Sequence, residues 1–274
     1  MKKLLSIITI AALALSLTAC GKPAEQKKSE LYSGGRGLYF DGTSEGLQSL
    51  YEQALAELPD KMPLPDGTTA DKNETAGFSL DYGCAYFDFA YIRYAEPIFE
   101  VTTSDDPNKL PKLESPEWIK VKAGDVLENG LKVVSAQTPC RVYDGTVSLG
   151  HGEVKLEGEI TLEGYFNYFH GSGSYGFGDY RYGFYPDTGK HRIPILYSST
   201  YSEQNDQPSL HHLEDNDNKL IYDGSGFDIF RFEDKALLDQ NFDHSFSCKA
   251  KLTYKNIVIS NGLMGEVIGA ELDL

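Results

Sequence analysis

The chain has 274 residues and a formal net charge of −16 at pH 7, with 41% hydrophobic and 12% aromatic residues. This composition is sufficient for a packed core and excludes an intrinsically disordered chain. The acidic balance also argues against nucleic acid as a partner, because phosphate backbones repel a negatively charged surface.

The first twenty residues have the layout of a secretory signal peptide. Positively charged Met1-Lys2-Lys3 is followed by a largely apolar run of 14 residues, Leu4–Leu17. That run is shorter than the about 20 apolar residues that a membrane-spanning helix needs. The last four residues, Leu17-Thr18-Ala19-Cys20, resemble the lipobox of bacterial lipoproteins. The resemblance implies that residues 1–19 are removed and that the sulfur of Cys20 carries a diacylglycerol.

The same resemblance implies an exported protein, lipid-anchored at the extracytoplasmic face of the cell membrane or outer membrane. Two acyl chains on Cys20 hold a protein stably at a bilayer, so the lipid bilayer is an expected partner. Removal of residues 1–19 takes away two lysines, so 23 basic and 41 acidic residues remain and the net charge becomes −18. Residues 20–36 are mostly polar, and we expect a flexible tether there.

A single amphipathic helix is predicted from about Glu45 to Leu58, with Ser44 as its N-cap and Pro59 as its stop. Its apolar stripe has helical spacing: Leu47, Leu50, Tyr51, Ala54, Leu55 and Leu58. The segment Gly42–Gly46 also matches the G-x-S-x-G pattern of a nucleophile elbow, and all six histidines follow it. An elbow normally follows several β-α units, which are missing here. The capping role is therefore favoured, and a catalytic Ser44 is the alternative.

Strands are predicted from Phe78 onward, because aromatic and β-branched residues dominate runs such as Tyr86–Ile92 and Ile98–Thr102. Prolines among charged residues at 105–117 predict a boundary between a domain at 37–104 and a β domain at 117–274. Three dipeptides between apolar runs predict hairpins with type I′ turns: Asn129-Gly130, Asp144-Gly145 and Asn261-Gly262.

Residues 153–166 read as one long strand with an apolar face that also carries Gly158 and Gly164. Its other face carries Glu153, Lys155, Glu157, Glu159, Thr161 and Glu163. Residues 248–255 have a lysine-rich outer face, and opposite charges across an antiparallel pair stabilise it. We therefore expect these two strands to be neighbours. We interpret the glutamate row as a solvated face, with a calcium site as the alternative.

Three cysteines remain once Cys20 carries lipid, so Cys84, Cys140 and Cys248 cannot all pair within one chain. Buried free thiols are favoured, and a disulfide between Cys140 and Cys248 is the alternative. Residues 211–217, His-His-Leu-Glu-Asp-Asn-Asp, lack the spacing of zinc and EF-hand motifs and are interpreted as a polar loop. No metal or other cofactor is predicted.

Residues 165–187 contain ten aromatic residues interleaved with five glycines. Tyrosines offer flat apolar faces and a hydroxyl, which suit sugar rings or a protein partner. The alternative is that these rings fill a core. The candidate ligand-binding residues are Tyr175, Tyr180, Tyr182, Tyr185 and Trp118.

Together these patterns predict a mainly β protein, an antiparallel barrel or sandwich with one N-terminal amphipathic helix. The preferred function is a non-enzymatic binding module on a surface lipoprotein, with a glycan or a protein as its ligand. One alternative is a surface hydrolase that uses Ser44 or paired carboxylates. Another is an envelope-structural or assembly protein.

Overall fold

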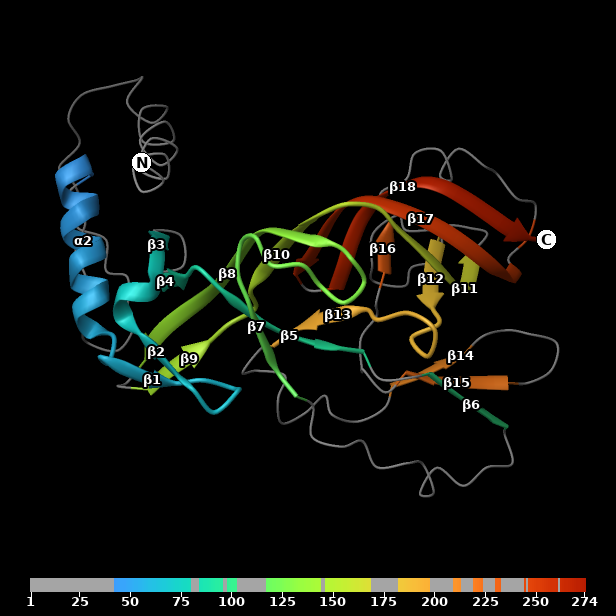
Figure 1. The fold of residues 1–274 in the computed structure, drawn as a ribbon, viewed down its shortest axis with the longest axis horizontal. Coiled ribbons are helices and arrows are strands. Elements are labelled where there is room, and N and C mark those ends of the chain that lie inside the picture. Colours follow the sequence, from blue (N-terminus) through green and yellow to red (C-terminus); the bar gives the residue numbers. More distant parts are fainter. Residues whose placement is uncertain are drawn as a thin grey trace. The chain divides into compact units, whose positions relative to one another are not determined.

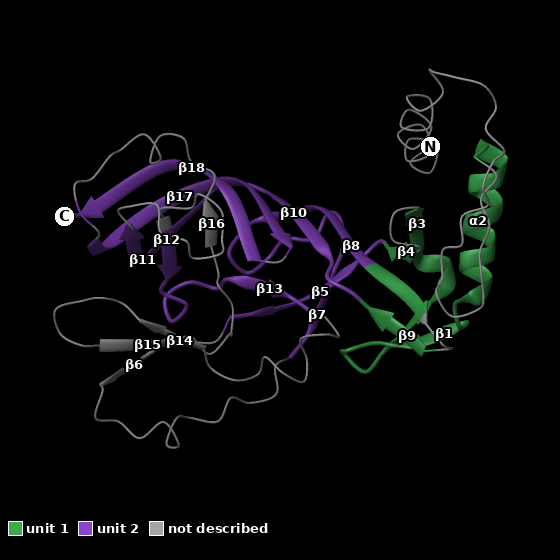
Figure 2. Ribbon diagram, turned by 180° about the vertical axis from the view of Figure 1, so that it is seen from behind, with its two compact units in different colours: residues 1–87, 139–149 green, residues 88–138, 150–274 purple. Residues whose placement is uncertain are grey.

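The computed structural model describes residues 42–79, 84–95, 98–102, 117–143, 146–168, 182–197, 209–212, 219–223, 230–232, 244, 246–260 and 262–274. This part of the chain is mainly β with antiparallel sheets, as predicted, and none of its sheets closes into a barrel. The chain forms two compact units, residues 1–87 with 139–149 (unit 1) and residues 88–138 with 150–274 (unit 2) (Figure 2). Cys20, the tether and residues 105–116 of the predicted boundary lie outside the described residues.

Unit 1 contains the helix α2, Ser44–Glu57, close to the predicted Glu45–Leu58 (Figure 1). The prediction of Ser44 as the N-cap is wrong. Thr43 caps the helix, because its Oγ1 accepts a hydrogen bond from the Gly46 amide at 2.9 Å. Leu50 and Ala54 are buried on the helix face and pack with Phe78 of strand β3.

The strands of unit 1 are short. They comprise β1 (Lys61–Pro63), β2 (Thr69–Asp71), β3 (Thr75–Ser79), β4 (Cys84–Phe87), β9 (Thr146–Leu149) and the second half of β8 (Lys132–Tyr143), together with the 3-10 turn η1 (Lys72–Glu74). β8 and β9 pair from Cys140 with Leu149 to Tyr143 with Thr146, which confirms the hairpin predicted around residues 144–145.

The prediction of one strand over Tyr86–Ile92 is wrong. β4 ends at Phe87 in unit 1 and the next strand begins at Ala90 in unit 2. At the break, the Phe89 carbonyl accepts a hydrogen bond from Thr138 Oγ1 at 2.7 Å. A buried carbonyl that is satisfied by a side chain needs no ladder partner, so the strand can be interrupted there.

Unit 2 contains the remaining strands: β5 (Ala90–Tyr94), β6 (Ile98–Thr102), β7 (Ile119–Val121), the first half of β8, β10 (Glu153–Glu157), β11 (Ile160–Tyr168), β12 (Tyr182–Pro186), β13 (Pro194–Leu196), β14 (Ser209–His212), β15 (Lys219–Asp223), β16 (Phe230–Phe232), β17 (Phe246–Ser260) and β18 (Gly262–Asp273). The prediction of a loop at His211 and His212 is wrong, because both lie in β14, which pairs with β15.

The largest sheet of unit 2 is built on the long hairpin of β17 and β18, which Figure 1 shows in red. β11 pairs antiparallel with the edge of β17 that is opposite β18. β12 pairs antiparallel with the other edge of β11. The predicted neighbours are thus confirmed: Glu163 lies opposite Lys251, and the hydroxyls of Thr161 and Thr253 are 2.9 Å apart. The predicted long strand is interrupted where Gly158 adopts a φ of 121°, so it forms two strands, β10 and β11.

The turn predicted at Asn129-Gly130 is present, but it is not type I′. Gly130 has a φ of 84°, whereas the one non-glycine residue with positive φ in the described ranges is Asn256. A type I′ turn needs positive φ at both central residues. The amides of Leu127 and Gly130 instead bond the carbonyls of Leu131 and Leu127, at 2.8 and 2.9 Å.

The core of unit 2 lies between two layers. The smaller sheet of β13, β5 and β7 contributes Ile92 and Leu196 to the same buried cluster as Leu162, Phe166 and Leu252 of the larger sheet. Burial of each such side chain contributes about 1.5–3 kcal/mol, so the cluster ties the two sheets together. On the other face of β11 and β12, Tyr165 and Tyr185 are half-buried and Asn167 is buried.

Candidate functional site

Two tyrosines lie side by side on the outer face of the larger sheet. Tyr165 of β11 is directly opposite Tyr185 of β12, and both are half-buried. Their neighbours along the strands, Phe166 and Phe184, point the other way and are buried in the core. The period of two in a β-strand therefore divides the predicted aromatic stretch into core rings and outer-face rings. Tyr185 was predicted as a binding residue, and Tyr165 was not.

Polar groups complete this surface, which we name the tyrosine platform: Tyr165, Tyr185, Asn167, Ser247 and Lys249. The register places Lys249 of β17 opposite Tyr165, and Ser247 opposite Asn167. The Ser247 hydroxyl donates to Asn167 Oδ1 at 2.6 Å. Asn167 itself is buried, and its Oδ1 is occupied by the Ser247 hydroxyl. The two half-buried rings, the Ser247 hydroxyl and the exposed ammonium group of Lys249 offer stacking surfaces and hydrogen-bonding groups, the combination found in ligand sites.

The backbones of the two platform strands, β11 and β12, approach each other closely at Gly164. A Cβ on Gly164 would lie 2.2 Å from the Tyr185 carbonyl oxygen and 2.6 Å from Pro186 Cα. Only glycine permits this approach, so the position of Tyr185 relative to Tyr165 depends on Gly164.

A cluster of charged residues borders the platform where β12 ends. Lys190 Nζ lies 3.3 Å from Glu163 Oε2 and 3.5 Å from Asp187 Oδ2. These two carboxylates raise the pKa of Lys190, with the hydrogen bond to Glu163 as the largest cause. The glutamate row is exposed, as predicted for a solvated face. Among the described residues no group of three His, Cys, Asp or Glu side chains could hold a metal ion.

Trp118, also predicted as a binding residue, lies in a second aromatic cluster of unit 2. Its ring meets Tyr197 edge to face, with centroids 5.0 Å apart and an interplanar angle of 83°. The guanidinium of buried Arg93 lies 5.4 Å from the Trp118 ring centroid. Trp118 and Tyr197 are half-buried, so they form a smaller candidate surface on the sheet of β5. Tyr197 was not predicted, because an isolated tyrosine after Leu196 carries no periodic signal.

The other predicted site residues are described only in part. Tyr182 lies in β12, where its backbone pairs with Tyr168. Tyr175 and Tyr180 lie outside the described residues. Trp118 directly precedes β7 of the smaller sheet, whereas Tyr185 lies in β12 of the larger sheet.

Ser44 is exposed on the first turn of α2. All six histidines of the chain, from His151 to His244, belong to unit 2, so unit 1 itself offers Ser44 no imidazole base. No described helix is sufficiently long and apolar to cross a membrane.

The three cysteines are free thiols, so the alternative disulfide between Cys140 and Cys248 is not formed. Burial, reinforced by neighbouring Cys84, raises the pKa of Cys140 to about 12. Cys140 Sγ instead contacts Met62 Sδ at 3.8 Å. A thiol with so high a pKa is a weak nucleophile, which fits a packing role for Cys140.

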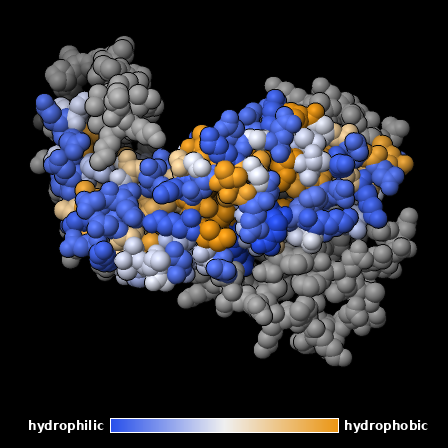
Figure 3. Space-filling view, viewed as in Figure 1, coloured by the Kyte–Doolittle hydropathy of each residue, from blue (hydrophilic) through white to orange (hydrophobic). Residues whose placement is uncertain are grey.

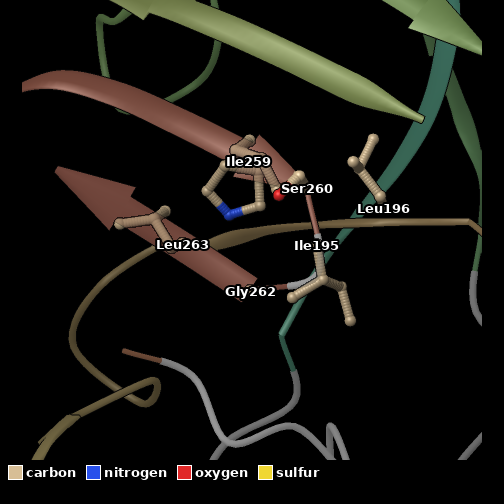
Figure 4. Close-up of a pocket in the computed structure, with 7 residues that line it drawn as sticks. Ile195, Leu196, Ile259, Ser260, Gly262 and Leu263 are labelled. Carbon is tan, nitrogen blue, oxygen red and sulfur yellow. The ribbon is translucent and has the colours of Figure 1, made fainter. Parts of the chain in front are cut away.

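The surface carries hydrophobic residues among hydrophilic ones (Figure 3). In the described part of the chain the exposed large hydrophobic residues are Ile119, Val126, Val134, Met264, Ile268 and Leu274. A small hollow beside the β17–β18 hairpin is lined mainly by apolar residues such as Ile195, Leu196 and Leu263, with Ser260 as its polar side chain (Figure 4). Its volume of about 10 Å³ is that of about one water molecule, so it is no ligand site.

No family model matches this chain, and neither does any curated protein or solved structure. Its function is therefore inferred from the residues of the sites themselves.

Proposed function

We propose that this chain is an exported lipoprotein, held at the extracytoplasmic face of a bilayer by diacylglycerol on Cys20. Its β body is a non-enzymatic binding module, and unit 2 is a two-layer antiparallel sandwich. The layered core of unit 2 supports the sandwich, and the signal-peptide layout with its lipobox supports the anchor. The net charge of −18 after removal of residues 1–19 means that the lipid, and not a basic surface, holds the protein at the membrane.

The tyrosine platform carries the proposal of binding. Tyr165 and Tyr185 lie opposite each other on the outer face, half-buried, while their strand neighbours fill the core. Strands only about 5 Å apart bring the two rings within reach of one ligand. Beside the rings, the half-buried Ser247 hydroxyl, which donates to buried Asn167, and the exposed ammonium group of Lys249 add hydrogen-bonding groups.

A glycan is the ligand that this chemistry fits best. Sugar rings present apolar C–H faces, which stack on aromatic rings, and hydroxyls, which pair with amide, hydroxyl and ammonium groups. Trp118 with Tyr197, and the tyrosines at 175 and 180, remain part of the proposal as further aromatic contacts. Tyr182 has the register of the core residue Phe184 in β12, so it is not counted with the platform.

The test is the melting temperature of the chain in the presence of polysaccharides, oligosaccharides and Ca²⁺. A ligand at one hundred times its Kd stabilises the folded state by about 2.7 kcal/mol. We expect a dose-dependent rise with a glycan that is lost in the double variant Tyr165→Ala/Tyr185→Ala. Tyr51→Ala is the matched control, because Tyr51 is a half-buried tyrosine on α2 in unit 1.

Two outcomes contradict the proposal. If every glycan leaves the melting temperature unchanged, glycan binding is wrong, and a protein partner or a structural role is favoured. If a glycan stabilises wild type and the double variant equally, the ligand binds elsewhere, and Trp118→Ala tests the second aromatic cluster.

A further inference from the structure

The end of strand β12 is held by an unusual hydrogen bond between the backbone and an imidazole. The Glu163 amide of β11 donates to Nε2 of His191 at 2.9 Å. A backbone N–H can only donate, so Nε2 must carry a free lone pair. The bond therefore exists only when the imidazole is neutral.

The position of His191 explains why the Glu163 amide of β11 has a side-chain acceptor. β12 ends at Pro186, which lies opposite Gly164, and the chain then turns over residues 187–191. The Asp187 amide still donates to the Glu163 carbonyl at 2.8 Å, as in a regular ladder. The Asp187 carbonyl, however, accepts from the amides of Lys190 and His191, both at 3.0 Å. It faces the turn, and the imidazole replaces it as the acceptor for the Glu163 amide.

Charged groups lie on the residues that flank this hydrogen bond. The carboxylates of Glu163 and Asp187 belong to the same cluster, where both contact Lys190. Lys251 faces Glu163 from β17, and Arg192 follows His191 with its Nε bonded to Glu128 at 2.9 Å. An imidazolium has two N–H donors and no acceptor, so it would leave the Glu163 amide and compete with Lys190 for the carboxylates.

We propose that His191 is a pH-sensitive latch that holds the end of β12, and with it Tyr185 of the tyrosine platform. Histidine is the side chain whose charge ordinarily changes between pH 5 and 8. At higher pH the neutral ring closes the latch on the Glu163 amide. At lower pH the protonated ring releases it and frees the turn that begins two residues after Tyr185. The consequence for ligand binding rests on the proposed function, whereas the latch itself does not.

The latch is tested by hydrogen exchange of the full chain in detergent at pH 7.5 and 5.5, read on peptides covering residues 161–168 and 182–191. Variants are compared with wild type at the same pH, so that intrinsic exchange rates cancel. His191→Gln keeps an acceptor oxygen and does not titrate, and His191→Ala removes the acceptor. His244→Gln is the matched control, since it removes an exposed histidine of unit 2 outside the cluster.

At pH 7.5 we expect His191→Ala to exchange about two- to tenfold faster than wild type in the 161–168 peptide, because one hydrogen bond is lost. Between pH 7.5 and pH 5.5 the protection of wild type should fall towards that of His191→Ala, while His191→Gln stays protected at both pH values. Equal exchange of wild type and His191→Gln at both pH values would overturn the latch, as would unchanged protection in His191→Ala at pH 7.5. If no glycan raises the melting temperature but the exchange pattern is as expected, the proposed function is wrong and the latch is supported.

Discussion

Gly164→Ala is expected to separate strands β11 and β12 and to destabilise unit 2. The added Cβ would lie 2.2 Å from the Tyr185 carbonyl oxygen, 2.6 Å from Pro186 Cα and 2.9 Å from the Tyr185 carbonyl carbon. Since real Cβ contacts are not shorter than 3.0 Å, the backbone of β12 must move by about 1 Å. Overpacking against groups that cannot rotate away costs typically about 1–3 kcal/mol. For 150–250 residues, about 2 kcal/mol lowers the melting temperature by about 4–8 °C.

Gly269→Ala is the matched control, because Gly269 lies in β18 of the same sheet and its added Cβ would meet only Thr253, at an ordinary 3.6 Å. Thermal unfolding followed by circular dichroism measures both variants. The expected result is a clear fall for Gly164→Ala and a small change for Gly269→Ala. If Gly164→Ala melts within about 1 °C of wild type, β12 does not lie against β11 at this position, and the platform geometry is wrong.

Three further predictions concern core, charge and thiols. Phe166→Ala should lower the free energy of unfolding by about 3–5 kcal/mol in denaturant titrations. Tyr165→Ala should lower it by less than half of that, because only Phe166 is fully buried. Equal losses would contradict the assignment of the two residues to opposite faces of β11. Burial lowers the pKa of the His151 imidazole in the folded chain. As the pH falls through about 6.5, the imidazole is therefore protonated in the unfolded chain before it is protonated in the folded chain. The stability gained from neutral His151 is full above that pH and declines below it, and His151→Gln should flatten the decline; an identical pH profile would refute this. Because burial and Cys84 raise the pKa of Cys140 to about 12, an alkylating reagent at pH 8 should modify half-buried Cys248 before Cys140, as read by mass spectrometry; equal rates would contradict the packing.

The sequence predicted best those features that depend on local periodicity. The bounds of α2 differ from the prediction by one residue at each end, because an apolar stripe and a following proline define a helix locally. Complementary charges also correctly identified β11 and β17 as neighbours. Glu163 nevertheless forms its ion pair with Lys190, 27 residues away, and not with Lys251 opposite it. Charge patterns on two strands predict adjacency, but the turn that follows β12 decides which cation is nearer.

Features that depend on distant residues could not be predicted. The break between β4 and β5 rests on Thr138, which is 49 residues from Phe89. The N-cap differs by one residue because Thr43 and Ser44 are chemically equivalent as caps, and only the backbone conformation at Thr43 selects it. For the site, alternation in β11 and β12 separates core rings from surface rings, but Tyr165 becomes a platform residue only once its register with Tyr185 is known.

The same register also explains why the tyrosine platform and His191 lie at the same end of β12. Gly164 allows β12 to approach β11 closely, Tyr185 lies opposite Tyr165, and one residue further β12 ends at Pro186. A strand that ends beside a longer partner leaves an edge amide of that partner without a ladder acceptor. Here this amide is that of Glu163, and it donates to Nε2 of His191 instead. Moving the end of β12 would therefore disturb the platform and the latch together. Gly164→Ala, which acts between them, should both weaken glycan stabilisation and speed exchange at Glu163, whereas His191→Gln should leave glycan stabilisation at pH 7.5 unchanged.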